Sequence, residues 1–169
     1  MTMLKSISIV FPLYNEENRL KKLFSEIINQ KIFKKKNIEF IFVNDGSDDL
    51  SLKLIKNFKS KNRDKINVIL INYKKNKGKG YAIKKGVFAA KKKWILTMDI
   101  DLSVRLNQLE IWKNKGYLVK DVYVYFGSRL LNASRVSSKK YRAFTGKLFN
   151  ITLDLIFNRK KLGIKDTQC

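Results

Sequence analysis

Two aspartates separated by one residue, Asp99 and Asp101, follow an apolar run in the stretch WILTMDIDLS. In an extended chain, side chains two apart point the same way, so both carboxylates are expected on one side, with Ile100 facing the interior. Two close anions favour a cation between them, and oxygen ligands favour Mg²⁺ or Mn²⁺, held jointly with the phosphates of a substrate. The alternative is a polar strand end whose aspartates cap the next helix, since short motifs often match by chance.

The residue types that are missing restrict the chemistry further. The chain contains no histidine, which excludes an imidazole base and a histidine-ligated zinc site. Its single cysteine, Cys169, excludes an internal disulfide and a cysteine–histidine nucleophile pair. A reducing location on the cytoplasmic side of a membrane is compatible with this composition, and we expect it.

The charge of the chain is strongly positive, with a formal net charge of +23 at pH 7. Such a charge fits nucleic acid, an anionic membrane surface or a polyanionic substrate. Lysines occur in nearly every segment rather than in one patch, which favours a solvated surface for most of them. No apolar run has the form of a signal peptide or reaches the ~18 residues of a membrane span, so we expect any membrane contact to be peripheral.

Strand-like and helix-like stretches alternate along the chain. The predicted strands cover residues 6–13, 38–43, 67–71, 94–98 and 122–126. The predicted helices cover residues 17–30, 79–90 and 106–115, and a further helix carries Leu52, Leu54, Ile55 and Phe58. This alternation predicts an α/β fold with a parallel sheet and right-handed crossovers, and strand 94–98 is apolar enough to be buried on both faces.

Polar clusters follow the predicted strands at residues 14–16, 44–45, 99–101 and 128–129. In parallel sheets ligands bind beyond the carboxyl ends of the strands, so this common edge is the expected site. Residues 130–140 lack a periodic pattern and predict a loop over that site. Residues 141–157 regain helical spacing and predict a core helix, with a helix lying on a membrane surface as the alternative.

Four motifs, FPLYNEE, VNDGSDD, NKGKGYAIKKG and MDIDLS, occur in the order and approximate spacing of the family 2 inverting glycosyltransferases, which the chain therefore resembles. The later segments FGSR, RAFTGKLFN and LGIKDTQC resemble the dolichyl-phosphate or polyprenyl-phosphate β-glucosyltransferase branch. Mannosyl-phosphate synthases resemble the first half equally well. The resemblance implies the GT-A fold, a Rossmann-like sandwich with a mostly parallel central sheet, in a single catalytic domain over residues 1–169.

The resemblance also implies which residues surround a nucleotide sugar. Asp45 would accept a hydrogen bond from uracil or ribose, although an Asx-type turn explains the same residue. Lys79 lies in a loop with Asn76, Gly78 and Gly80, where it would face phosphate unless it is simply a surface lysine. The implied nucleotide-sugar-binding residues are Pro12, Tyr14, Glu16, Val43, Asp45, Lys79, Asp99, Ile100 and Asp101.

The implied catalytic residues fall into a donor group and an acceptor group. Asp99 and Asp101 would join Mg²⁺ or Mn²⁺ to the diphosphate, with Ser103 as a third polar contact. An alkyl phosphate is already anionic and needs no base, so the acceptor requires cations. Arg129 and Arg142 match the family's arginines and suit phosphate oxygens, although Arg129 has a surface position as its alternative. Asp166 would orient the sugar or the acceptor.

The implied function is transfer of glucose from UDP-glucose to dolichyl or polyprenyl phosphate at a membrane surface. Two alternatives stay open: a GDP-mannose-dependent polyprenyl-phosphate mannosyltransferase, and an inactive nucleotide-binding fragment of the same fold. Val104 and Arg105 stand where relatives have threonine and proline, and relatives continue beyond the DTQC stretch, so we expect a domain incomplete at its C-terminus. Nucleic acid is disfavoured as a partner because the aspartates cluster at the edge where a polyanion would dock.

Overall fold

The computed structural model describes residues 6–30, 37–117, 124, 125 and 127. The chain divides into two compact units, residues 1–120 and 121–169, and every helix and strand given below belongs to the first. The single-domain prediction therefore stays a prediction. Of the predicted strand 122–126, only Val124 and Tyr125 are described, and neither lies in a strand. The predicted loop 130–140 and helix 141–157 lie outside the described residues.

Strands and helices alternate through the first unit, as the sequence predicts. In chain order they are β1 (Ile7–Leu13), α1 (Glu17–Asn29), β2 (Ile38–Asp45), α2 (Ser51–Lys61), β3 (Asn67–Tyr73), α3 (Lys79–Ala89), β4 (Trp94–Thr97) and α4 (Gln108–Asn114). All described strand pairs are parallel, in the order β3-β2-β1-β4. The carboxyl ends of these strands therefore meet at one edge, and the predicted α/β class is confirmed. Within the described residues, no helix combines the length and apolar character needed to cross a membrane.

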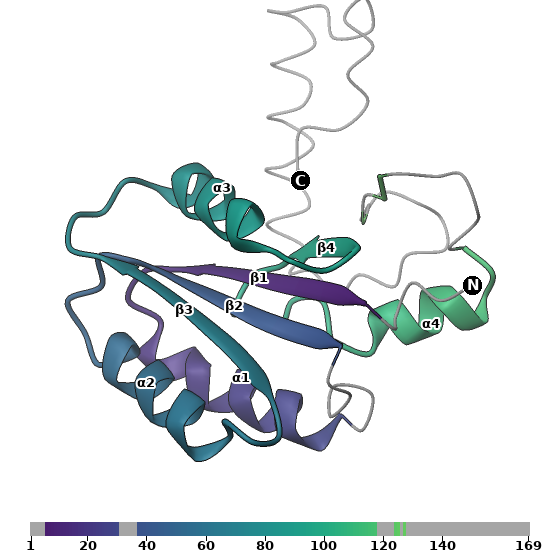
Figure 1. The fold of residues 1–169 in the computed structure, drawn as a ribbon, viewed down its shortest axis with the longest axis horizontal. Helices are drawn as coiled ribbons and strands as arrows, with labels where there is room; N and C mark the ends of the chain where they lie inside the picture. The colour runs from purple at the N-terminus through teal and green to yellow at the C-terminus, as the bar shows by residue number, and fades with distance from the viewer. Residues whose placement is uncertain (1–5, 31–36, 118–123, 126, 128–169) are drawn as a thin grey trace, which may run out of the picture. The chain divides into compact units, whose positions relative to one another are not determined.

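Helices cover both faces of the sheet, with α1 and α2 on one face and α3 on the other (Figure 1). The larger core lies on the side of α1 and α2, where helical spacing brings Leu20, Leu23 and Ile27 inward. Aromatic rings fill its centre, with Phe24 and Phe58 stacked at 4.1 Å between ring centroids. Burying each such side chain contributes about 1.5–3 kcal/mol, so this face holds most of the packing free energy.

The smaller core lies under α3 and fixes the start of that helix. Val10, Ile41, Val43 and Ala82 form this core. Gly86 permits close packing, because a β-carbon there would collide with the side chain of Val10. A crossover helix runs opposite to the strands that it joins, so α3 begins at the carboxyl edge of the sheet. Lys79, the first residue of α3, therefore lies at the edge where the sequence predicts a site.

Strand β4 differs from the prediction of a strand buried on both faces. Trp94 and Leu96 pack against the larger core, whereas Ile95 is 43% exposed and Thr97 is also exposed. Helix α3 packs on β1 and β2, and β4 is bonded only to β1 among the described strands. The prediction is therefore wrong for one face of β4. An apolar run does not reveal whether a helix covers the second face of its strand.

A buried carboxylate fixes the beginning of β4. Glu39 is 2% exposed, and its Oε1 accepts hydrogen bonds from the hydroxyl of Ser8 at 2.6 Å and from the backbone amide of Lys91 at 2.7 Å. The amide of Lys92 in turn donates to the hydroxyl of Ser8 at 3.1 Å. These bonds hold the turn before β4 against β1 and β2, and so help to set the register that places the end of β4.

Candidate functional site

A cleft of about 370 Å³ lies at the carboxyl edge of the sheet. The residues that line it come from β1, the loop between β1 and α1, α1, β2, the loop before α3, α3 and the turn after β4. They are Pro12, Leu13, Tyr14, Glu16, Arg19, Asp45, Asn76, Gly78, Lys79, Ala82, Asp99, Ile100 and Asp101. The structure thus brings together every predicted nucleotide-sugar-binding residue except Val43.

The remaining predicted residues lie elsewhere. Val43 is fully buried in the smaller core, in β2 two residues before Asp45. Ser103 is absent from the lining and makes its hydrogen bonds to Asp101. Arg129, Arg142 and Asp166 lie outside the described residues. The described part of the site is therefore the donor half of the predicted site.

The acidic pair lies in a turn just beyond β4. Ile100 between the acids is 3% exposed and belongs to the larger core, whereas Asp99 and Asp101 are exposed in the cleft. Leu102 also packs against that core and has a φ of 56°, which is rare for a bulky residue and costs about 1–2 kcal/mol. The two acids therefore face the cleft and Ile100 faces the core, as the sequence predicts. The cause is different, however: an anchored turn after β4 produces this arrangement, and not the alternation of side chains along a strand.

Each acid of the pair is balanced by its surroundings. The Nζ of Lys79 lies 2.8 Å from Oδ1 of Asp99. Ser103 donates its backbone amide to Oδ1 of Asp101 at 2.9 Å and its hydroxyl to Oδ2 at 2.7 Å. Arg19 pairs with Glu16 at 2.7 Å, and that hydrogen bond, with a weaker contribution from Asp101, raises the pKa of Arg19. A cation of α3 therefore pairs with Asp99, and a cation of α1 interacts electrostatically with Asp101.

The donor atoms in this part of the cleft fit a hard divalent cation. They are carboxylate oxygens with a neighbouring serine hydroxyl, and the described residues contain no cluster of three or more acidic or cysteine side chains that could enclose an ion alone. Mg²⁺ and Mn²⁺ are commonly held by one or two carboxylates together with substrate phosphates. Asp99 and Asp101 match that mode of binding, which leaves coordination positions for an anionic ligand.

Asp45 occupies the other end of the cleft and is the last residue of β2. Its side chain is 3% exposed, and Oδ1 accepts a hydrogen bond from the amide of Lys77 at 2.8 Å. The Asx-turn alternative fails to describe this bond, because the donor lies in the loop before α3. The hydroxyl of Tyr73 is buried close by without a hydrogen-bond partner among the described residues, and burial first, then its interaction with the Asp45 carboxylate, raises the pKa of Tyr73.

Gly46 holds the loop before α3 against the end of β2. Its φ is 72°, and a β-carbon there would lie 2.7 Å from the amide nitrogen of Asn76 and 2.9 Å from the carbonyl carbon of Lys75. Only glycine adopts this backbone conformation without strain and leaves room for the neighbouring backbone. The glycine of the VNDGSDD motif therefore permits the contact between Asp45 and Lys77.

The acidic motifs after β1 and β2 bind each other. The carboxylate of Asp49 accepts the amide of Glu17 at 3.0 Å, while the carboxylate of Glu17 accepts the amide of Leu50 at 2.9 Å. Asn15 accepts the amide of Asp48 at 2.9 Å in the same interface. Each loop thus supplies hydrogen-bond acceptors for backbone amides at the start of the other loop's helix. We assign these residues to stabilising the starts of α1 and α2.

Sequence reasoning missed Arg19, which lines the cleft from the first turn of α1. It lies three residues after Glu16, and residues three apart share one side of a helix. The three-residue spacing from Glu16, a predicted site residue, would have been enough to predict that Arg19 lies at the site.

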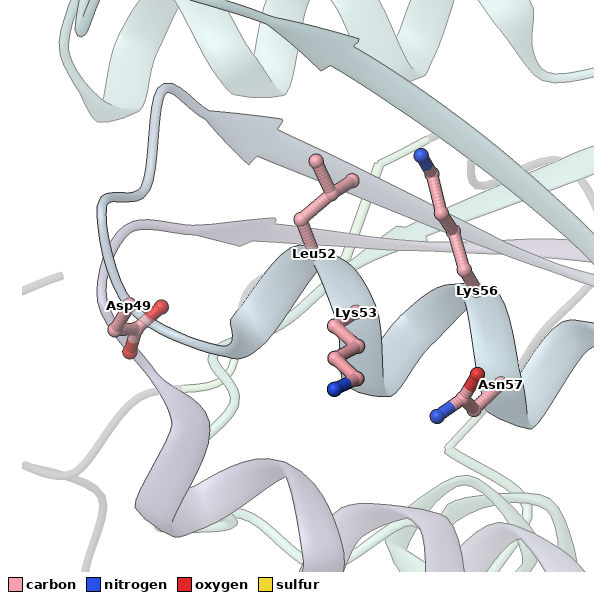
Figure 2. A pocket seen from close by; sticks show the side chains of 5 residues that line it. All are labelled: Asp49, Leu52, Lys53, Lys56 and Asn57. Carbon is pink, nitrogen blue, oxygen red and sulfur yellow. The ribbon is translucent and has the colours of Figure 1, made fainter.

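A second hollow, of about 350 Å³, lies along α2 and is lined by Asp49, Leu52, Lys53, Lys56 and Asn57 (Figure 2). Its one carboxylate, that of Asp49, accepts the amides of Glu17 and Ser51. The hollow lacks a pair of carboxylates, and we assign no chemistry to it.

Solved structures share the fold of this chain. A mannosyltransferase from Pyrobaculum calidifontis, solved in complex with GDP-Man and Mn²⁺, matches 61% of this chain and 30% of its own, with a TM-score of 0.55 and 19% identity. S. aureus TarS 1-349 in complex with UDP-GlcNAc matches 64% of this chain and 30% of its own, with a TM-score of 0.55 and 24% identity. These likenesses confirm the predicted GT-A glycosyltransferase fold.

The sequence comparisons identify the family. A family model described as Glycosyl transferase family 2 matches residues 8–154, and the chain belongs to this family. It is 32% identical over 172 residues to dolichyl-phosphate beta-glucosyltransferase ALG5D of Trichomonas vaginalis, covering 96% of this chain and 51% of that protein. It is 32% identical over 182 residues to the Homo sapiens dolichyl-phosphate beta-glucosyltransferase, covering 98% and 53%. The chain spans about half the length of these curated relatives.

Proposed function

We propose that this chain carries the donor site of an inverting glycosyltransferase that moves glucose from UDP-glucose to dolichyl phosphate or a related polyprenyl phosphate. The observation that carries the proposal is the shared cleft that brings Asp45 and the acidic pair Asp99 and Asp101 together at the carboxyl edge of the sheet. The names of the relatives, dolichyl-phosphate beta-glucosyltransferases, support glucose as the sugar and a lipid phosphate as the acceptor.

The nucleoside would bind at the Asp45 end of the cleft. A carboxylate only accepts hydrogen bonds, so it suits the N–H of uracil or a ribose hydroxyl. A base that offers no donor there would leave a buried carboxylate oxygen unpaired, at a cost of about 1–3 kcal/mol. Pro12 at the end of β1 and Tyr14 just after it line the same cleft, and Tyr14 is 45% exposed, which leaves its ring accessible to a base.

The diphosphate would lie between Asp45 and the acidic pair. Asp99 and Asp101 would hold Mg²⁺ or Mn²⁺, which supplies positive charge to the departing nucleoside diphosphate. Glu16 and Arg19 would form the wall of the cleft toward α1, and Lys79 would contact a phosphate oxygen. Ser103 would hold Asp101 in place through the two hydrogen bonds that it donates.

The acceptor needs no base, because an alkyl phosphate is an anion at neutral pH and can attack the anomeric carbon directly. Its oxygen forms the new bond as the bond from the sugar to the nucleoside diphosphate breaks. Arg129 and Arg142 would hold this anion through guanidinium hydrogen bonds, and Asp166 would orient the sugar or the acceptor. The lipid would be reached from the cytoplasmic side by peripheral contact with the membrane.

A donor panel tests the proposal. Purified chain is incubated with Mn²⁺, a short polyprenyl phosphate and UDP-glucose, GDP-mannose or UDP-N-acetylglucosamine, and the lipid product is measured. We expect transfer from UDP-glucose, with loss of about 10²-fold or more in Asp99→Ala and Asp101→Ala, the scale of a lost electrostatic stabiliser. Asp64→Asn is the matched control, because Asp64 is an exposed acid outside the cleft.

The panel also separates the alternatives. Preferred transfer from GDP-mannose would replace glucose by mannose, and binding of UDP without transfer from any donor would indicate a binding-only fragment. Full transfer by both aspartate variants would refute the metal role of the acidic pair.

A further inference from the structure

Lys79 and Asp99 form an ion pair inside the cleft that the proposed chemistry must break. The distance from Nζ to Oδ1 is 2.8 Å, and the pair joins the first residue of α3 to the turn after β4. The two side chains are 64% and 54% exposed. Exposed ion pairs are weak because water competes for both charges, so this pair can open without disturbing the fold.

The backbone before Lys79 is fastened to the nucleoside end of the cleft. The amide of Lys77 donates to Asp45 at 2.8 Å, and the amide of Gly78 donates to the side chain of Asn76 at 3.0 Å. The start of α3 is therefore fixed relative to Asp45, while the side chain of Lys79 reaches Asp99. Lys79 thus spans the interval between nucleoside and acidic pair, where a diphosphate would lie.

A divalent ion and the ammonium group of Lys79 compete for Asp99. Mg²⁺ binds its oxygen ligands at about 2.0–2.1 Å, and its two positive charges repel a neighbouring ammonium. In the absence of a nucleotide, displaced Lys79 would lose its anionic partner. A bound diphosphate offers that side chain a new partner within the same cleft.

We infer that Lys79 neutralises Asp99 before the donor binds and moves to the diphosphate when a divalent ion takes Asp99. This inference rests on the proposed function, because it requires a nucleoside diphosphate in the cleft. It gives Lys79 a role beyond contact with phosphate: the side chain weakens binding of the metal alone and links metal binding to nucleotide binding. Such coupling is reciprocal, so each ligand tightens the other by the same factor.

Mn²⁺ binding measured by the free-ion EPR signal tests the inference without catalysis. The affinity for Mn²⁺ is determined with and without UDP in the wild type, in Lys79→Gln and in Lys79→Arg. We expect Lys79→Gln to bind Mn²⁺ alone about two- to five-fold more tightly, the scale of an exposed ion pair, and to show a correspondingly smaller enhancement by UDP. Lys79→Arg keeps the positive charge and should stay close to the wild type.

The matched control is Lys84→Gln. Lys84 is an exposed lysine of the same helix, and its ammonium group lies over the ring of Phe88, outside the cleft. This variant should bind Mn²⁺ and UDP as the wild type does, and similar melting temperatures will show that the variants fold alike. Equal Mn²⁺ affinity and equal UDP enhancement in Lys79→Gln and the wild type would overturn the inference alone. A wild type whose Mn²⁺ affinity does not respond to UDP would overturn the proposed function as well.

Discussion

Gly46→Ala tests the contact that holds Asp45 and the loop before α3 together. The substitution adds one β-carbon at a φ of 72°, where it would lie 2.7 Å from the amide nitrogen of Asn76 and 3.0 Å from the carbonyl oxygen of Lys74. Both neighbours are backbone atoms, so no side chain can rotate away. The loop must shift instead, and this shift would break the hydrogen bond from Lys77 to Asp45.

The size of the effect follows from two contributions. A left-handed conformation costs an alanine about 1–2 kcal/mol, and a hydrogen bond to a charged group contributes about 1.5–3 kcal/mol. We therefore expect Gly46→Ala to lower the free energy of unfolding by about 2.5–5 kcal/mol. Gly116→Ala is the matched control, because its φ is 70° and a β-carbon there meets nothing within 4 Å. That control should cost only the conformational part, about 1–2 kcal/mol.

Urea denaturation of both variants measures the difference, with the slope of the transition checked for two-state behaviour. The structure requires Gly46→Ala to be the more destabilising by roughly 2 kcal/mol, the share of the lost hydrogen bond. Equal destabilisation by the two variants would refute the close packing of the loop on Gly46. UDP titration of folded Gly46→Ala should also show weaker binding, because Asp45 would lose its fixed position.

Substitutions at three further positions test other parts of the fold. Asp49→Ala should cost about 1 kcal/mol in urea denaturation, since it removes a helix cap. Burial opposes the charge of Asp49, but its hydrogen bonds outweigh burial and lower its pKa. The stability that this charge gives should therefore be complete above about pH 4, the unfolded pKa, and the advantage over Asp49→Asn should shrink as the pH falls further. Glu39→Ala should cost about 2–4 kcal/mol by stranding the hydroxyl of Ser8 and the amide of Lys91, and Glu39→Gln, which keeps an acceptor oxygen, should cost less; equal losses would contradict the proposed network. Gly80→Ala should leave the melting temperature unchanged or raised, because the added methyl group meets nothing within 4 Å in the first turn of α3, and a clear loss would be contrary to that open environment.

The sequence predicted the order of the elements and most of the cleft. Apolar runs indicate buried strands, and apolar residues three to four apart indicate helices, because the buried positions follow the geometry of each element. The carboxyl ends of parallel strands share one edge, so the motifs that follow β1, β2 and β4 could be placed together before any coordinates were known. Asp45, Lys79, Asp99 and Asp101 meet in the cleft for this reason.

Other features depended on contacts that no local pattern records. The predicted strand 38–43 ended before Asn44 and Asp45, whereas β2 continues through both residues because pairing with β3 extends the strand. The acids Glu17 and Asp49 cap helices from loops that are distant in sequence, so their partners could not be read from either motif. The exposed face of β4 is a further example. Its apolar sequence predicts burial, but it does not show whether another element covers each face of the strand.

The most direct test of the donor site is calorimetric titration of UDP into the chain with and without Mn²⁺. The central claim is that Asp99 and Asp101 bind the metal that joins the diphosphate to the cleft. Mn²⁺ should therefore tighten UDP binding by about ten-fold or more in the wild type and in Asp64→Asn, and it should have no effect in the double variant Asp99→Asn, Asp101→Asn. An unchanged dependence on Mn²⁺ in the double variant would contradict the claim.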